Sequence, residues 1–167
     1  MYENFINPQS FRIFTLIKTV HSIFMSILPV FAWILLRHGS YLLFLKRSKK
    51  NRNWPLHWTI PWGKIEDWEE VIDCAIRETL EEVGVHIRRS DILAETTVHT
   101  TYVDGEKTAH IFLVDTWEGM PDNIERDLHD EFTWKTLADL PTPMIPHIRV
   151  GIEWILDHKK QVEYYAN

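Results

Sequence analysis

The feature that most constrains the fold is an acidic stretch containing Glu78, Glu81 and Glu82, which we predict to be helical. On a helical wheel of about 100° per residue with Glu78 at zero, Glu82 lies at about 40° and Glu81 at about 300°. The three carboxylates therefore share one face. Like charges at these spacings repel each other and destabilise the helix that carries them. A divalent cation would offset the repulsion, and carboxylate oxygens suit Mg²⁺ or Mn²⁺.

The residues on either side predict where this helix begins and ends. Asp67 and Glu70 have the spacing of a capping box, so we expect the helix to begin near Trp68. Gly84 predicts its end at Val83. The opposite face of the wheel is expected to pack on the core and carries Ile72, Ile76, Thr79, Leu80 and Val83.

Three glutamates alone are more typical of a solvated helix face than of a metal site. The wider pattern from Gly63 to Val85 favours the metal site, because it resembles the complete sequence motif of the Nudix hydrolase family. The matching positions are Gly63, Glu69, Arg77, Glu78, Glu81, Glu82, Gly84 and Val85. Trp62 stands where the family often has a glycine and Thr79 where it usually has an aliphatic residue, and neither change removes a metal-binding group.

The resemblance implies a role for each motif residue. Glu78, Glu81 and Glu82 are expected to hold Mg²⁺ or Mn²⁺ against a diphosphate, with Arg77 orienting Glu78. The backbone carbonyl of Trp62 is expected to be a further metal ligand.

Four other residues complete the expected site. Gly63 is expected to let the backbone turn tightly enough to offer a carbonyl oxygen to the metal. Gly84 is expected to end the helix, and Glu69 to stabilise the junction between the loop and the helix. Glu131 resembles the acid on a later loop that some family members use as ligand or base, and a surface role is an equal alternative. Either this acid or one of the helix glutamates would act as the general base.

The implied reaction is hydrolysis of the diphosphate bond in a nucleoside diphosphate linked to another moiety. Our leading hypothesis is conversion of a (d)NTP to a (d)NMP and pyrophosphate, because the segments 108–112 and 117–119 resemble the MutT branch. Hydrolysis of dinucleoside polyphosphates or nucleotide sugars is the alternative. A non-catalytic Nudix ligand sensor is disfavoured, because all the motif glutamates are present.

Aromatic and basic residues before the motif are candidates for substrate binding. Trp58 would either stack on a nucleobase or pack in the core. Lys46 and Arg47 would either attract polyphosphate or end a solvated hairpin.

The hydrophobic pattern predicts one domain of mixed strands and helices in this chain of 167 residues. We expect an α/β (α+β) fold, the Nudix-type α/β/α sandwich around a mixed sheet. The expected strands are 30–36, 41–46, 94–101, 108–117 and 132–135, and the last helix is 145–159.

Residues 1–27 are expected to form an apolar helical extension before a Nudix domain at 28–167. The run from Thr19 to Leu36 has no Lys, Arg, Asp or Glu, which raises a transmembrane alternative, although Pro29 interrupts it. We expect the extension to contact a second copy in a homodimer or to lie on a membrane surface.

Overall charge indicates which class of partner the protein binds, and cysteine content indicates its cellular compartment. The net charge of −6 argues against binding a nucleic-acid polymer, so the expected partner is a small nucleotide. The single cysteine, Cys74, suits the reducing cytoplasm.

Overall fold

The computed structural model describes residues 29–102, 105–158 and 161–165. Strand β1 (Val30–His38) lies at the centre of a mixed sheet with the order β3-β2-β1-β6-β5-β8, in which β4 also pairs with β1 and β7 with β2. The β1–β6 and β5–β8 pairs are parallel, and the other pairs are antiparallel. The remaining elements are β2 (Tyr41–Arg47), β3 (Trp58–Thr59), β4 (Trp62–Lys64), α2 (Val71–Val83), η1 (Arg89–Asp91), β5 (Ile92–Tyr102), β6 (Gly105–Val114), β7 (His129–Thr136), η2 (Leu137–Asp139), α3 (Pro146–Leu156) and β8 (Gln161–Tyr165).

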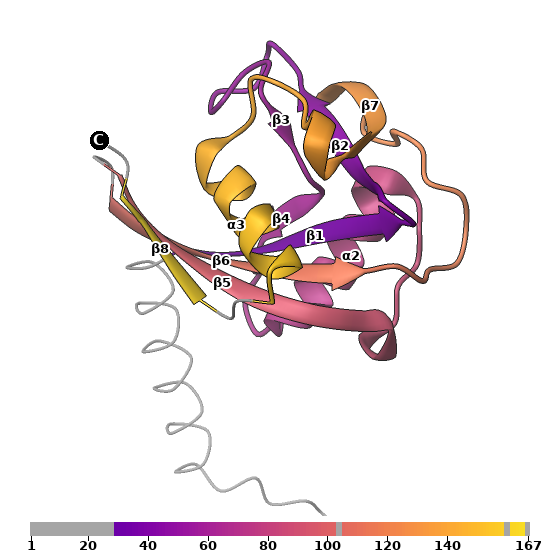
Figure 1. The fold of residues 1–167 in the computed structure, drawn as a ribbon, viewed down its shortest axis with the longest axis horizontal. Helices are drawn as coiled ribbons and strands as arrows, with labels where there is room; N and C mark the ends of the chain where they lie inside the picture. The colour runs from indigo at the N-terminus through magenta and orange to yellow at the C-terminus, as the bar shows by residue number, and fades with distance from the viewer. Residues whose placement is uncertain (1–28, 103–104, 159–160, 166–167) are drawn as a thin grey trace, which may run out of the picture.

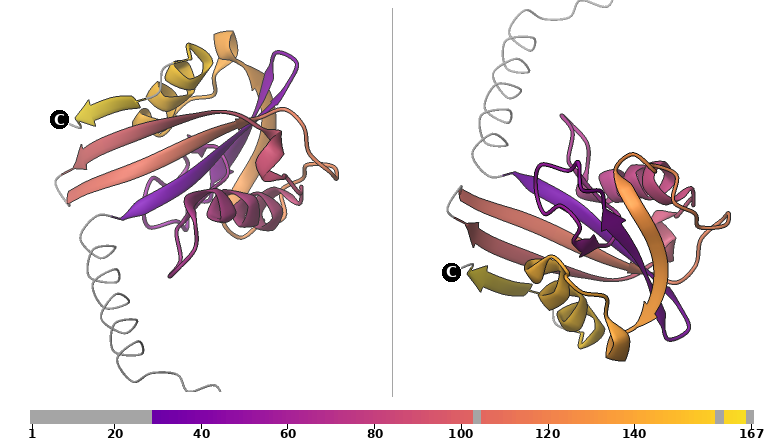
Figure 2. Two further views of the ribbon diagram at one scale, coloured as in Figure 1. Left: turned by 90° about the horizontal axis from the view of Figure 1, so that it is seen from below. Right: turned by 90° about the horizontal axis from the view of Figure 1, so that it is seen from above.

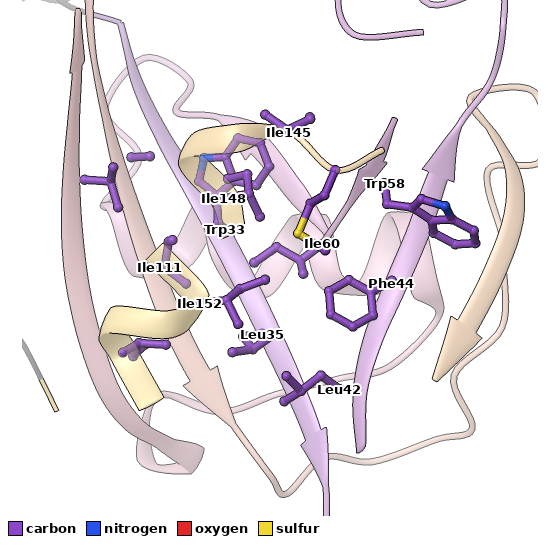
Figure 3. Close-up of a cluster of buried hydrophobic side chains, with 14 of the residues drawn as sticks. Trp33, Leu35, Leu42, Phe44, Trp58, Ile60, Ile111, Ile145, Ile148 and Ile152 are labelled. Atoms are coloured by element: carbon purple, nitrogen blue, oxygen red, sulfur yellow. The ribbon is translucent and has the colours of Figure 1, made fainter. Parts of the chain in front are cut away.

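The two long helices cover opposite faces of this sheet, as Figures 1 and 2 show. Successive side chains of a strand point to opposite faces, and β1 buries both sets. Ala32 and Ile34 belong to the cluster that packs on α2. Trp33 and Leu35 belong to the cluster under α3, which Figure 3 shows. The predicted α/β/α sandwich around a mixed sheet is therefore confirmed.

The predicted start of the acidic helix is wrong. Helix α2 begins at Val71, with Glu70 as its N-cap and no side-chain capping bond. Trp68 has a φ of 69°, in the left-handed region, so it cannot continue a right-handed helix. The backbone N–H of Glu66 donates to Glu69 Oε2 at 3.1 Å, and this contact stabilises the loop in place of the predicted Asp67 capping box. The predicted end at Gly84 is confirmed, with a φ of 71°.

The C-terminal boundaries also differ from the prediction. Helix α3 ends at Leu156, because His158 adopts a φ of 58° that breaks the helix before residue 159. Strand β8 follows and pairs in parallel with β5. Strand β8 is not among the predicted strands, because a short parallel strand depends on a partner distant in the chain. Strand β6 ends at Val114, three residues before the predicted end at Trp117.

The predicted N-terminal extension, residues 1–27, lies outside the described residues. Within the part of the chain that the structure describes, no helix is both long and apolar enough to cross a membrane.

Candidate active site

Helix α2 packs four of the five predicted core-facing residues on the core, because Thr79 and Val83 are buried and Ile72 and Ile76 pack against the same cluster. Its buried residues include Ala75, Thr79 and Val83, which follow each other at i, i+4 spacing. Leu80, predicted to be buried, is 50% exposed, whereas Glu82 is only 4% exposed. The prediction for Leu80 is wrong because the buried face is centred on Thr79, and Glu82 lies one turn from it on the sheet side. One of the three predicted acids is therefore a buried residue.

Glu82 is held by the short strand that precedes the helix. The backbone N–H of Trp62 donates to Glu82 Oε2 at 2.8 Å. Glu82 Oε1 lies 3.6 Å from His129 Nε2. Burial raises the pKa of Glu82 well above its usual value, and the charges of Glu78 and Glu125 raise it further. The charge of Arg47 opposes these shifts, but no Lys or Arg among the described residues is at ion-pair distance from an ionised Glu82.

Glu78 lies against the backbone of Gly63. A Cβ at position 63 would stand 1.8 Å from Glu78 Oε1 and 1.9 Å from Glu78 Cδ. This glycine is needed for the close approach of a carboxylate, not for a left-handed backbone. Burial raises the pKa of Glu78, although the hydrogen bond from Arg77 opposes the shift.

Arg77 connects the acids of the motif. Its Nε and Nη2 donate to the two carboxylate oxygens of Glu69 at 2.9 and 3.0 Å. Its Nη1 donates to Glu78 Oε1 at 2.5 Å and to Glu81 Oε2 at 3.4 Å. The hydrogen bonds from Arg77 lower the pKa of Glu69. Glu69 therefore anchors the guanidinium, and the guanidinium fixes Glu78 beside the more exposed Glu81.

The acid on the later loop that approaches the helix is Glu125, not the predicted Glu131. Glu131 lies on β7, where it forms an ion pair with Lys46 of β2 at 2.6 Å. Ligand atoms of Glu82, Glu125 and His129 all lie within 4.8 Å of one another. Burial raises the pKa of Glu125, and the charge of Glu81 adds to the effect. Glu125 lies in the acidic loop before β7 and His129 is the first residue of that strand. The sequence of this segment has no periodic pattern that would have marked either one as a site residue.

The donor groups fit a divalent cation. Carboxylate oxygens converge from α2 and from the loop before β7, and hard oxygen donors are the ligands that Mg²⁺ and Mn²⁺ take. The buried Glu82, without a Lys or Arg ion-pair partner in the described residues, is the position where a bound cation would relieve the most repulsion. Cys74 lies on the same helix, but burial raises the pKa of its thiol to about 12, which excludes a thiolate nucleophile at neutral pH.

A cavity of about 350 Å³ lies next to this acidic face. Trp62 links the two, because its backbone binds Glu82 while the residue also lines the cavity. The lining combines four aromatic rings with three cationic side chains and consists of Phe31, Trp33, Arg47, Arg52, Asn53, Trp54, Trp62, Thr100, Lys107, Ala109, Ile145 and His147. No carboxylate is part of that lining among the described residues.

The predicted substrate contacts are only partly in this cavity. Arg47 lines it, with its guanidinium held by Asn53 O at 3.0 Å and by Asn51 Oδ1 at 3.1 Å. Trp58 is instead 8% exposed within the core cluster that Figure 3 shows, so the core alternative holds for it. Lys46 lies over the ring of Trp58 and does not line the cavity.

Comparison with known proteins identifies the family of this chain. A family model described as the NUDIX domain matches residues 25–155. The 8-oxo-dGTP diphosphatase of Buchnera aphidicola is 28% identical over 98 residues, covering 59% of this chain and 73% of that protein. The mRNA-decapping protein g5R of African swine fever virus is 35% identical over 83 residues, which are 49% of this chain and 33% of the viral protein. The structure of the MutT Nudix hydrolase from Burkholderia pseudomallei matches with a TM-score of 0.66 and 26% identity, over 75% of this chain and 95% of that one. The chain therefore belongs to the NUDIX domain family and is a MutT-like Nudix hydrolase.

Proposed function

We propose that this enzyme hydrolyses a nucleoside or deoxynucleoside triphosphate to the monophosphate and pyrophosphate, with Mg²⁺ or Mn²⁺ as cofactor. The observation that carries the proposal is the position of Trp62, which joins the carboxylates of α2 to an aromatic cavity lined by cations. The base would enter the cavity, and the phosphates would then extend toward α2. The cavity volume lies within the range of small-molecule sites.

The residues of α2 would hold the cation and position the diphosphate. When bound, a divalent cation supplies neutralising charge at the diphosphate oxygens and lowers the pKa of water. Trp62 holds one oxygen of Glu82, and Arg77 holds one oxygen of Glu78, so each side chain has a fixed direction. The raised pKa values of Glu78 and Glu125 make either of them a better proton acceptor than an exposed carboxylate.

The cations of the cavity suit a substrate that carries negative charge and carbonyl groups. Arg47, Arg52 and Lys107 line it together with Asn53. Burial lowers the pKa of His147 to about 4, so this side chain is neutral near pH 7. Asn53 adds a side-chain amide, a group that can both donate and accept hydrogen bonds. The named activity of the Buchnera relative, a diphosphatase for a modified dGTP, supports a triphosphate of this size as substrate.

Chromatography of the products from a nucleotide panel tests the proposal. The panel contains the common NTPs and dNTPs, a dinucleoside polyphosphate and a nucleotide sugar, each with purified full-length protein and Mg²⁺. We expect at least one triphosphate to give a monophosphate and pyrophosphate with the highest kcat/KM. A preference for the dinucleoside polyphosphate or the sugar nucleotide would overturn the triphosphate assignment while leaving the class of bond cleaved unchanged.

Arg77→Lys is expected to lower kcat/KM about tenfold or more, because a lysine cannot contact Glu69 on two oxygens and reach Glu78 as well. Steady-state kinetics measures the loss. Arg89→Lys is the matched control, because Arg89 pairs with Glu70 and Asp73 on the exposed start of the same helix. An equal loss of kcat/KM in the two variants would show that Arg77 has no specific role in catalysis.

Trp54→Leu is expected to raise KM about tenfold with little change in kcat, because base stacking on an aromatic ring contributes about 1–3 kcal/mol per base. Steady-state kinetics with the preferred triphosphate gives both constants. Trp117→Leu is the control, since Trp117 stacks on Trp134 and does not line the cavity. An unchanged KM for Trp54→Leu would show that the base binds elsewhere.

A further inference from the structure

His129 has a buried side chain whose ring nitrogens lack a hydrogen-bond partner in the part of the chain that the structure describes. It is the first residue of β7 and is 1% exposed. Neither ring nitrogen has a hydrogen-bond partner among the described residues, although the backbone carbonyl of His129 accepts a bond from Asn123 Nδ2 at 2.8 Å. Buried polar groups without partners are uncommon in folded proteins and call for a reason, such as a bound ion. The backbone is therefore anchored while the imidazole is left with free coordinating atoms.

The imidazole points at two carboxylates. Its Nε2 lies 3.6 Å from Glu82 Oε1, which is too long for a hydrogen bond. Glu125 completes the group, with all three ligand atoms within 4.8 Å of one another. Ligands about 2.1 Å from one metal ion lie roughly 3 to 4.2 Å apart, so a small closure of the loop would bring the three atoms onto one ion.

Other groups near His129 do not take its nitrogens. Arg47, its partner in the β2–β7 register, donates from its guanidinium to Asn51 and Asn53 instead. Asp130 follows His129 in the chain and is exposed. An ion shared with Glu82 and Glu125 would satisfy one imidazole nitrogen and both acids at once.

The chemistry of the donor set points to one class of cation. Mg²⁺ takes oxygen ligands almost exclusively, whereas an imidazole nitrogen suits first-row transition metals. We propose that Glu82, Glu125 and His129 form a mixed carboxylate–imidazole site that takes Mn²⁺ or Co²⁺ in preference to Mg²⁺. This inference deepens the proposed function, since Glu82 also belongs to the catalytic face. The site can nevertheless be tested without substrate.

Pulsed EPR of the full-length protein with one equivalent of Mn²⁺ and no nucleotide tests the site. We expect electron-spin-echo modulation from a directly bound ¹⁴N, changing to the ¹⁵N pattern when the protein is labelled with ¹⁵N-histidine. This comparison uses the wild-type chain, so it does not depend on whether a variant folds. Absence of nitrogen modulation in the wild-type complex would overturn the proposal.

His129→Gln assigns the signal to one residue. We expect this variant to lose the nitrogen modulation and at least about tenfold in Mn²⁺ affinity, with Mg²⁺ affinity changed much less. His110→Gln is the matched control, because His110 already pairs with Glu95 at 2.7 Å on another strand, and it should keep the signal. Circular dichroism establishes that each variant is folded.

Two outcomes separate this inference from the proposed function. Nitrogen modulation that persists in folded His129→Gln would overturn the assignment even if the enzyme hydrolyses triphosphates. Nitrogen modulation that depends on His129, in a protein without triphosphate activity, would leave the metal site standing and remove the proposed function.

Discussion

Glu82→Gln is expected to lose at least about a hundredfold in hydrolysis rate while keeping the fold. The amide oxygen of glutamine can still accept the bond from the Trp62 N–H, so the side chain stays in place. The substitution removes the negative charge that a divalent cation would bind. Steady-state kinetics at saturating Mg²⁺ measures the loss. An activity within threefold of the wild type would contradict the role given to Glu82.

The same variant should be more stable than the wild type when no metal is present. Burial raises the folded-state pKa of Glu82 above its unfolded value, so the folded protein holds this proton more tightly. The contribution of Glu82 to stability is therefore greatest below its unfolded pKa and is lost as pH rises through the folded pKa. Thermal melts in chelator should show a higher Tm for Glu82→Gln at pH 8 and a smaller difference at pH 5.

Glu153→Gln is the control for both measurements. Glu153 lies on the exposed side of α3, where it pairs with Arg149 at 3.2 Å. This exposed pair contributes little to stability, so the substitution should leave both rate and Tm nearly unchanged.

Gly63→Ala is expected to lower kcat about a hundredfold with only a small loss of stability. The new Cβ would occupy the position of the Glu78 carboxylate, 1.8 Å from Oε1. Because that group is the end of a flexible side chain, it can move away at little cost to folding. Moving it breaks the contact with Arg77 and misplaces a proposed metal ligand. Kinetics and thermal melts of the variant measure the two effects separately.

Gly39→Ala provides the comparison for a glycine outside the site. Gly39 has a φ of 61° in the β1–β2 turn, and a Cβ there would meet no atom of the described residues within 4 Å. Gly39→Ala should lower the stability of the protein, because alanine is strained at this positive φ, and it should leave kcat unchanged. If Gly63→Ala retained full activity, the contact between Gly63 and Glu78 would have no catalytic importance.

The motif, the first hairpin and the approximate positions of most strands could be predicted from sequence because each depends on local spacing. Strand β1 alternates between two buried faces, and the motif acids are close together in the chain. The wheel alone could not show that Glu82 is buried and Leu80 exposed, because tertiary contacts with Trp62 and His129 determine the orientation of α2.

The cavity residues were harder to predict because they come from separate elements. Trp33 is on β1, Trp54 is in the loop after β2, and His147 is on α3. Trp58 was predicted to bind substrate because it is near the motif, but β3 pairs with β2 and the ring of Trp58 packs in the core. Glu131 was predicted from its resemblance to a later-loop acid of the family, and the sequence alone does not show its ion pair with Lys46.

Pyrophosphate release from the preferred triphosphate, measured against divalent cation, tests the central account most directly. We predict no turnover in excess chelator, full recovery with excess Mg²⁺ or Mn²⁺, and poor activity with Ca²⁺, whose longer bonds and looser geometry misplace the attacking water. Full activity in excess chelator would contradict a mechanism built on the carboxylates of α2.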